Sequence, residues 1–132
     1  MRTRTTILFA SVLFGCMTPA LAETEFEEFR RIAGEISSLI LRMNHNLVSD
    51  SKLPDDGLEW KTTGSDAELC ADMRRSEIII HRKRELLAKN VLAHKEEWVV
   101  GLANAQIGLE AGTLTMFRGA FRKRFTRCGE PA

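Results

Sequence analysis

Residues 25–47 read EFEEFRRIAGEISSLILRMNHNL, and this stretch decides the fold. Its apolar side chains alternate spacings of three and four residues, at Phe26, Phe29, Ala33, Ile36, Ile40, Met43 and Leu47. Such spacing lines one face of a helix with apolar groups, as in helical bundles. The start of this stretch has Thr24 and Glu27 at the spacing that satisfies free backbone donors at a helix start. We therefore predict a helix over about 25–48 whose phenylalanines pack in a core.

Residues 49–64 are predicted to form a long loop, because the periodicity disappears and Asp, Pro and Gly recur. We expect Leu58 and Trp60 to pin this loop to the helices. Ser65 and Glu68 repeat the capping pattern and so begin a second helix. Its predicted apolar stripe contains Leu69, Met73, Ser76, Ile80, Leu87, Val91, His94 and Trp98.

The other face of the second helix is densely charged, with Arg74, Arg75, Glu77, Arg82, Lys83, Arg84, Glu85 and Lys89. Mixed signs at helical spacing are typical of a solvated surface. A basic docking patch at Arg82, Lys83 and Arg84 is the functional alternative. On this face we expect His81 to pair with Glu77, one turn earlier.

Residues 98–117 contain a single charged side chain, Glu110. Small residues step through this region by four and three, at Gly101, Ala105, Gly108, Gly112, Thr115 and Gly119. A stripe of this kind lets a second backbone approach closely. Because large apolar residues occupy the remaining sides, we predict a helix buried nearly all round. Glu110 is expected to face water or to pair with Arg118 or Asn104, since burying an unpaired carboxylate is costly.

Two cysteines, Cys70 and Cys128, follow the first helix and are predicted to form a disulfide. If two antiparallel helices bring them together, the chain must reverse near residue 99, within 94–101. The predicted fold is all-α, an antiparallel three-helix bundle with one disulfide. A short fourth helix is expected if Gly112 breaks the last one.

Residues 1–22 are predicted to be a secretory signal peptide. Arg2 and Arg4 precede a short apolar run, and Ala20-Leu21-Ala22 supplies a cleavage site. The run is shorter than the ~20 residues that a membrane-spanning helix needs. We therefore expect a single helical domain over 23–132, located in the periplasm or secreted. The alternative is a lipid anchor on Cys16, because Leu13-Phe14-Gly15-Cys16 resembles the box before a lipid-modified cysteine.

The charge balance argues against nucleic acid as a partner. The chain has a formal net charge of +1, and loss of Arg2 and Arg4 with the leader brings it to −1. The basic residues Arg118, Arg122, Lys123 and Arg124 nevertheless form a predicted patch. Phe117, Phe121 and Phe125 are interleaved with them, and we expect these rings to pack against the first helix rather than lie on an anionic membrane.

No stretch resembles a nucleophile elbow, a phosphate-binding glycine loop or a zinc-binding His-Glu-x-x-His. The sequence therefore predicts a non-enzymatic protein without a cofactor or a metal. We expect it to bind an envelope or extracellular protein, or a second copy of itself. The candidate contact residues are Gly101, Ala105, Gly108, Gly112 and Glu110. The alternatives are a membrane-active protein that uses residues 98–117 and a carrier of a small ligand or metal.

Overall fold

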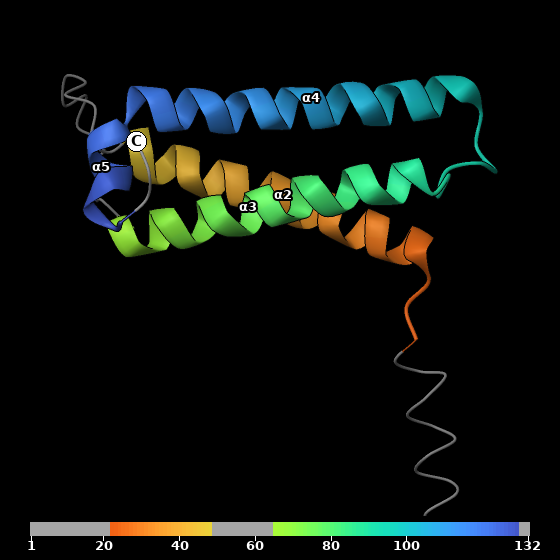
Figure 1. The fold of residues 1–132 in the computed structure, drawn as a ribbon, viewed down its shortest axis with the longest axis horizontal. Helices are drawn as coiled ribbons and strands as arrows, with labels where there is room; N and C mark the ends of the chain where they lie inside the picture. The colour runs from red at the N-terminus through yellow and green to blue at the C-terminus, as the bar shows by residue number, and fades with distance from the viewer. Residues whose placement is uncertain (1–21, 49–64, 130–132) are drawn as a thin grey trace, which may run out of the picture.

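The computed structural model describes residues 22–48 and 65–129, and within these ranges the ordered elements are all helices. They are α2 (Glu25–Val48), α3 (Asp66–Ala88), α4 (Glu97–Ala120) and α5 (Arg122–Arg127). The three long helices run antiparallel in succession, and α5 folds across the end where α3 begins (Figure 1). Because α3 contacts each of the other helices, it is the central element. The predicted all-α bundle with a short fourth helix is confirmed; the predicted leader and the predicted loop with Leu58 and Trp60 lie outside the described residues.

The start and the apolar face of α2 follow the sequence prediction. The hydroxyl of Thr24 accepts a hydrogen bond from the Glu27 backbone N–H at 3.0 Å. The core side of the helix buries Phe29, Ile32, Ile36, Leu39, Met43 and Leu47. Phe26 is half-buried, and the centroid of its ring lies 4.8 Å from that of His94, edge to face. The phenylalanine pair therefore packs within the protein, as predicted.

Three arginine–carboxylate pairs join α2 to α3, and in each pair two nitrogens of one guanidinium bind one carboxylate. They are Arg42 with Asp72, Arg75 with Glu35, and Arg82 with Glu28. The arginine hydrogen bonds hold the pKa values of Glu28 and Glu35 below their usual range. Since the fork of a guanidinium fits a carboxylate in few orientations, these pairs fix how α2 and α3 align. The charged face of α3 is thus only partly solvated.

The core side of α3 begins as predicted and then changes register. Ser65 caps the helix by accepting from the Glu68 backbone N–H at 3.2 Å, and Leu69, Met73, Ser76 and Ile80 are buried. Beyond Ile80 the prediction is wrong. The inward positions are Lys83 and Leu86, whereas Leu87 and Val91 are half-buried and His94 and Trp98 are exposed.

Lys83 and Glu110 form a buried ion pair between α3 and α4. The Lys83 side chain is 1% exposed and the Glu110 side chain 7%, and Lys83 Nζ donates to Glu110 Oε1 at 2.8 Å. The ring centroid of Phe29 lies 5.7 Å from the same nitrogen. The predictions of a solvated Lys83 and of a Glu110 that pairs with Arg118 or Asn104 are therefore wrong. Each charge is tolerated inside because the other compensates it.

The reversal between α3 and α4 occupies residues 89–96, a few residues before the predicted position at 94–101. Asn90 adopts the left-handed conformation, with φ 58°. The backbone N–H of Asn90 donates to the Leu87 carbonyl, and that of Val91 donates to the Leu86 carbonyl. This pattern ends α3 with a Schellman-type cap, for which asparagine is a common substitute for glycine. The later break falls at Phe121, not at Gly112, which α4 passes without interruption.

A disulfide and two arginine contacts close the end of the bundle where α5 lies. Cys70 and Cys128 are bonded, with their Cα atoms 6.5 Å apart. Arg124 is buried, and it donates to Asp66 Oδ1 at 2.7 Å and to the Asn46 carbonyl at 3.0 Å. The hydrogen bond from Arg124 holds the pKa of Asp66 below its usual range. This end of the molecule therefore joins α2, α3 and α5 in one place.

We expect Lys83→Met or Glu110→Leu alone to lower the free energy of unfolding by about 3 kcal/mol, because each leaves an uncompensated buried charge. The double variant Lys83→Met/Glu110→Leu should regain most of that loss, since two apolar groups then fill the same site. Urea denaturation followed by circular dichroism, with the disulfide intact, measures all three variants. Single variants that are as stable as the parent chain would contradict the buried pair.

Removal of the disulfide by Cys70→Ala/Cys128→Ala is expected to cost about 4 kcal/mol of stability, because the bond closes a long loop in the unfolded chain. Thermal unfolding with and without a reductant provides the comparison. Reduction should lower the melting temperature of the parent chain to near that of the double variant. An unchanged melting temperature on reduction would mean that the two sulfurs are not bonded in solution.

Candidate functional site

Helix α4 has one buried side and one exposed side. Ile107, Glu110, Leu114 and Phe117 are buried against the rest of the bundle. The prediction that this helix is buried nearly all round is wrong, because four large apolar side chains are 60% to 74% exposed: Trp98, Leu102, Leu109 and Met116. The cause is geometric. Both α2 and α3 lie on the same side of α4, and the opposite side has no helix beside it among those described (Figure 1).

The exposed side of α4 is apolar along nearly its whole length. We define the α4 face as Trp98, Gly101, Leu102, Ala105, Gly108, Leu109, Gly112, Met116 and Gly119, all of which are exposed. At 3.6 residues per turn these positions lie opposite Ile107 and Leu114. The only hydrogen-bonding group among their side chains is the Trp98 indole N–H, which donates to the carboxylate of Glu96.

Three of the polar residues that flank the α4 face donate hydrogen bonds to their own helix. Asn104 donates to the Val100 carbonyl at 3.0 Å, and Thr113 and Thr115 donate to the carbonyls four residues earlier, at 2.8 and 3.0 Å. These side chains therefore offer little hydrogen bonding to a molecule that docks on the face. Recognition there would depend on shape and apolar contact.

Among the described residues, none packs closely against the glycines of the α4 face. A Cβ atom built at Gly101, Gly108, Gly112 or Gly119 meets no other atom within 4 Å. Glycine inside a helix is less stable than alanine by about 0.5–1 kcal/mol. Helix α4 thus contains four residues that weaken it and that the isolated bundle does not require. Because glycine has no side chain, these positions form hollows between the large side chains of the face.

The predicted contact residues are brought together with one exception. Gly101, Ala105, Gly108 and Gly112 share the α4 face. Glu110 lies on the opposite side of the helix, buried with Lys83, so its charge is not presented to a partner. The large residues of the face, predicted to be buried, are exposed. Their spacing, with four- and three-residue steps from Trp98 to Met116, was the available signal.

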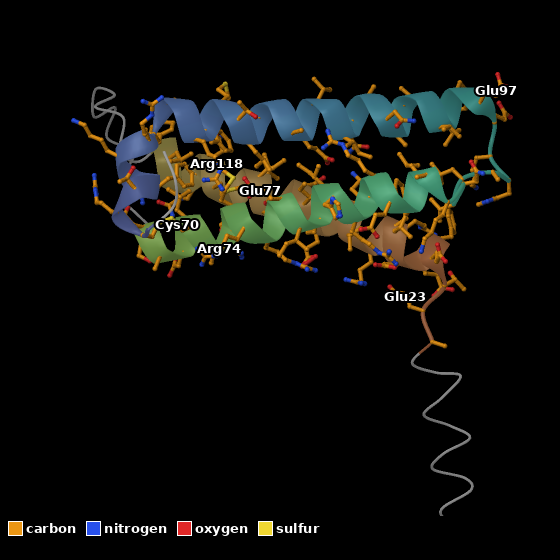
Figure 2. All side chains as sticks on the ribbon, viewed as in Figure 1. Glu23, Cys70, Arg74, Glu77, Glu97 and Arg118 are labelled. Atoms are coloured by element: carbon orange, nitrogen blue, oxygen red, sulfur yellow. A yellow bond between two sulfur atoms is a disulfide. The ribbon has the colours of Figure 1, made fainter. Side chains whose placement is uncertain are left out.

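The predicted basic patch is divided by the fold. Arg118 pairs with Glu77 at 2.8 Å between α4 and α3, as Figure 2 shows, and Arg124 is buried with Asp66. Only Arg122 and Lys123 of the four remain exposed, just beyond the C-terminal end of the α4 face. The aromatic residues there belong to the core, with Phe117 and Phe125 buried and Phe121 half-buried. Their predicted packing against the first helix stays a prediction, because α5 contacts mainly α3 and α4.

A shallow groove lies between α3 and α4. It holds about 250 Å³ and has Ile80, Ala111 and Leu114 among its lining residues. His81 at its edge pairs with Glu85 at 2.9 Å instead of with Glu77, because Glu77 is taken by Arg118. Within residues 22–48 and 65–129, no three His, Cys, Asp or Glu side chains gather closely enough to hold a metal ion.

None of the helices in the described part of the chain combines the length and apolar character needed to cross a lipid bilayer. No protein family, curated protein or solved structure matches the chain. What the protein does must therefore be inferred from its own residues. Among the described residues, the α4 face is the feature that packing within one chain leaves unexplained.

We expect Gly108→Ala and Gly112→Ala each to raise the free energy of unfolding of the single chain by about 0.5–1 kcal/mol. The added methyl group meets no neighbour and removes a source of helix weakness. The matched control is Gly129→Ala, which should lower stability because Gly129 has φ 80°. Denaturation at low protein concentration, where copies stay apart, measures the three variants. A loss of stability in Gly108→Ala would show that the chain itself uses that space.

Proposed function

We propose that the protein is a non-enzymatic binding module that docks against another protein through the α4 face. The observation that carries this proposal is the composition of that face, in which every side chain is apolar or absent from Trp98 to Gly119. At ~1.5 Å per residue the face is about 30 Å long. Monomeric proteins rarely expose a contiguous apolar patch of this extent unless it meets a partner.

The residue types of the α4 face match those of interface centres. Trp98 and Met116 belong to classes that are enriched in protein interfaces, whereas lysine and the acidic residues are depleted at their core. An exposed tryptophan at one end of an apolar strip is a natural anchor, because its ring contributes a large contact area when a pocket encloses it. The intervening glycines allow a partner to approach the helix backbone closely.

The disulfide and the predicted leader support an oxidising compartment as the place of action. A bond between Cys70 and Cys128 persists where thiols are not kept reduced. We propose a periplasmic or secreted protein whose mature form is 23–132. A lipid anchor through Cys16 is the alternative, and it would hold the same bundle at a membrane surface.

A membrane surface fits the α4 face less well than a protein does. Interfacial helices present Lys and Arg beside their apolar face, where these residues reach lipid headgroups. The flanks of α4 instead contain uncharged residues, Asn104, Gln106, Thr113 and Thr115. The exposed Glu96 and Glu97 at the start of the helix would be repelled by anionic lipid. The apolar strip therefore favours a protein partner.

The test uses tagged 23–132 with its disulfide intact, incubated with the envelope and extracellular fractions of its source and, separately, with untagged 23–132. We expect Leu109→Lys to reduce the retained protein about tenfold or more, since it places a charge at the centre of the face. The matched control is Leu41→Lys, which alters an equally exposed leucine, 70% exposed, on α2.

Two outcomes would contradict the proposed function. One is retention of the same proteins by the parent chain and by Leu109→Lys, because binding would then use another surface. The other is flotation of the parent chain with anionic vesicles, lost in Leu109→Lys but kept in Leu41→Lys, which would assign the face to lipid.

A further inference from the structure

We propose that the occupant of the α4 face is a second copy of this chain, with the two α4 helices antiparallel about a two-fold axis between Gly108 and Leu109. The inference rests on the proposed function and names the partner for the same face. Two-fold pairing uses one patch on both copies, so the patch must complement itself. The α4 face meets this requirement in shape and in charge.

In this register three of the four large side chains of the α4 face lie opposite glycines. An axis at Ala105 would match as many, but it would leave the charged ends of the two helices apart. With the axis beside Gly108 and Leu109, Trp98 of one copy lies opposite Gly119 of the other. By the same rule Met116 lies opposite Gly101, and Leu109 lies opposite Gly108. Each of these three large side chains thus meets a glycine, which is the arrangement of knobs filling holes, whereas Leu102 lies opposite Thr115. The glycines that the single chain does not need become the holes that the pair requires.

A parallel pairing of the same helices lacks this fit. Trp98 would face Trp98 and Leu109 would face Leu109, while the glycines would face one another across empty space. Close-packed interfaces tolerate neither the crowding nor the voids. The sequence of large and small residues therefore selects the antiparallel direction.

The charges at the two ends of α4 favour the same direction. Glu96 and Glu97 are exposed at the N-terminal end, and Arg122 and Lys123 are exposed just past the C-terminal end. Antiparallel pairing brings the acidic end of each copy beside the basic end of the other, twice by symmetry. The nearby Lys95 turns instead toward α2, where its Nζ lies 5.5 Å from the ring centroid of Phe26. Parallel pairing would oppose like charges at both ends.

The first test measures the mass of 23–132 in solution by sedimentation over a range of concentrations, with the disulfide intact. We expect a concentration-dependent dimer for the parent chain. Gly108→Leu should weaken the dimer about tenfold or more, because it fills the hole opposite Leu109 on both copies, and it should leave the single chain folded by circular dichroism. Leu41→Lys, on α2, is the control that should leave the dimer unchanged.

The second test establishes the direction of the helices with a short thiol-specific cross-linker. Leu109→Cys lies beside the proposed axis, leaves the hole at Gly108 open and should cross-link to its copy. Ala120→Cys should not, because its two copies would be about 35 Å apart at ~1.5 Å per residue. Cross-linking of both variants would mean a parallel pair and would overturn the proposed geometry.

The third test exchanges the charges at the ends. Glu96→Lys/Glu97→Lys should weaken the dimer, and adding Arg122→Glu/Lys123→Glu to the same chain should restore it, since each end again meets its opposite. If the fourfold variant stays folded but its dimer is not restored, the proposed charge pairing is overturned.

These outcomes separate the inference from the proposed function. A parent chain that stays monomeric at every concentration overturns the second copy as partner. If Leu109→Lys still loses a protein retained from the envelope or extracellular fraction, the α4 face remains a binding site for another protein. A dimer that persists in Leu109→Lys would instead place self-association elsewhere on the molecule.

Discussion

The buried ion pair between Lys83 and Glu110 is the contact on which the rest of the structure depends. A carboxylate that must reach a lysine inside the bundle can do so from only one rotation of α4 about its axis. Each residue of a helix advances about 100°, so inward Glu110 requires Leu109, Gly112 and Met116 to point outward. Turning the helix to hide its apolar strip would leave two opposite charges without compensation. The pair thus determines which side of α4 is exposed, although it contributes nothing to that side directly.

The other polar contacts hold together the helices below α4, which are α2, α3 and α5. Three arginine–carboxylate pairs align α2 with α3, and the disulfide with the buried Arg124 fixes α5 across one end. Between the described helices, the ion pairs of α4 run to α3, through Glu110 and Arg118. This distribution leaves the far side of α4 free of charged groups. The α4 face is therefore presented on a bundle whose other helices are firmly held together.

Local signals in the sequence predicted what local forces decide. The capping residues Thr24 and Ser65 gave correct helix starts, and the cysteine pair predicted which ends meet. The failures at charged residues concern partners distant in the chain. Lys83 and Glu110 are separated by 27 residues and compensate each other only once α3 and α4 pack. Likewise Arg124 is removed from the basic patch by Asp66, 58 residues earlier. The periodicity of the sequence identified the small and large residues of the α4 face. It could not show that α2 and α3 both lie on the opposite side of α4.

The contacts that anchor α4 are unevenly distributed along its length, so its two ends differ in mobility. The covalent link and the buried arginine lie where α4 meets α5. The opposite end, near Trp98, is held by the packing of Leu92, Val99 and Val100 on the core and of His94 and Lys95 on Phe26. A helix that is anchored at one end fluctuates most at its other end. Amide hydrogens should accordingly exchange with solvent along a gradient, fastest near Trp98 and slowest near Phe117. The ring of Trp98, at the end of the α4 face, would then move more than the other side chains of the face. It is therefore the side chain best placed to contact a partner first.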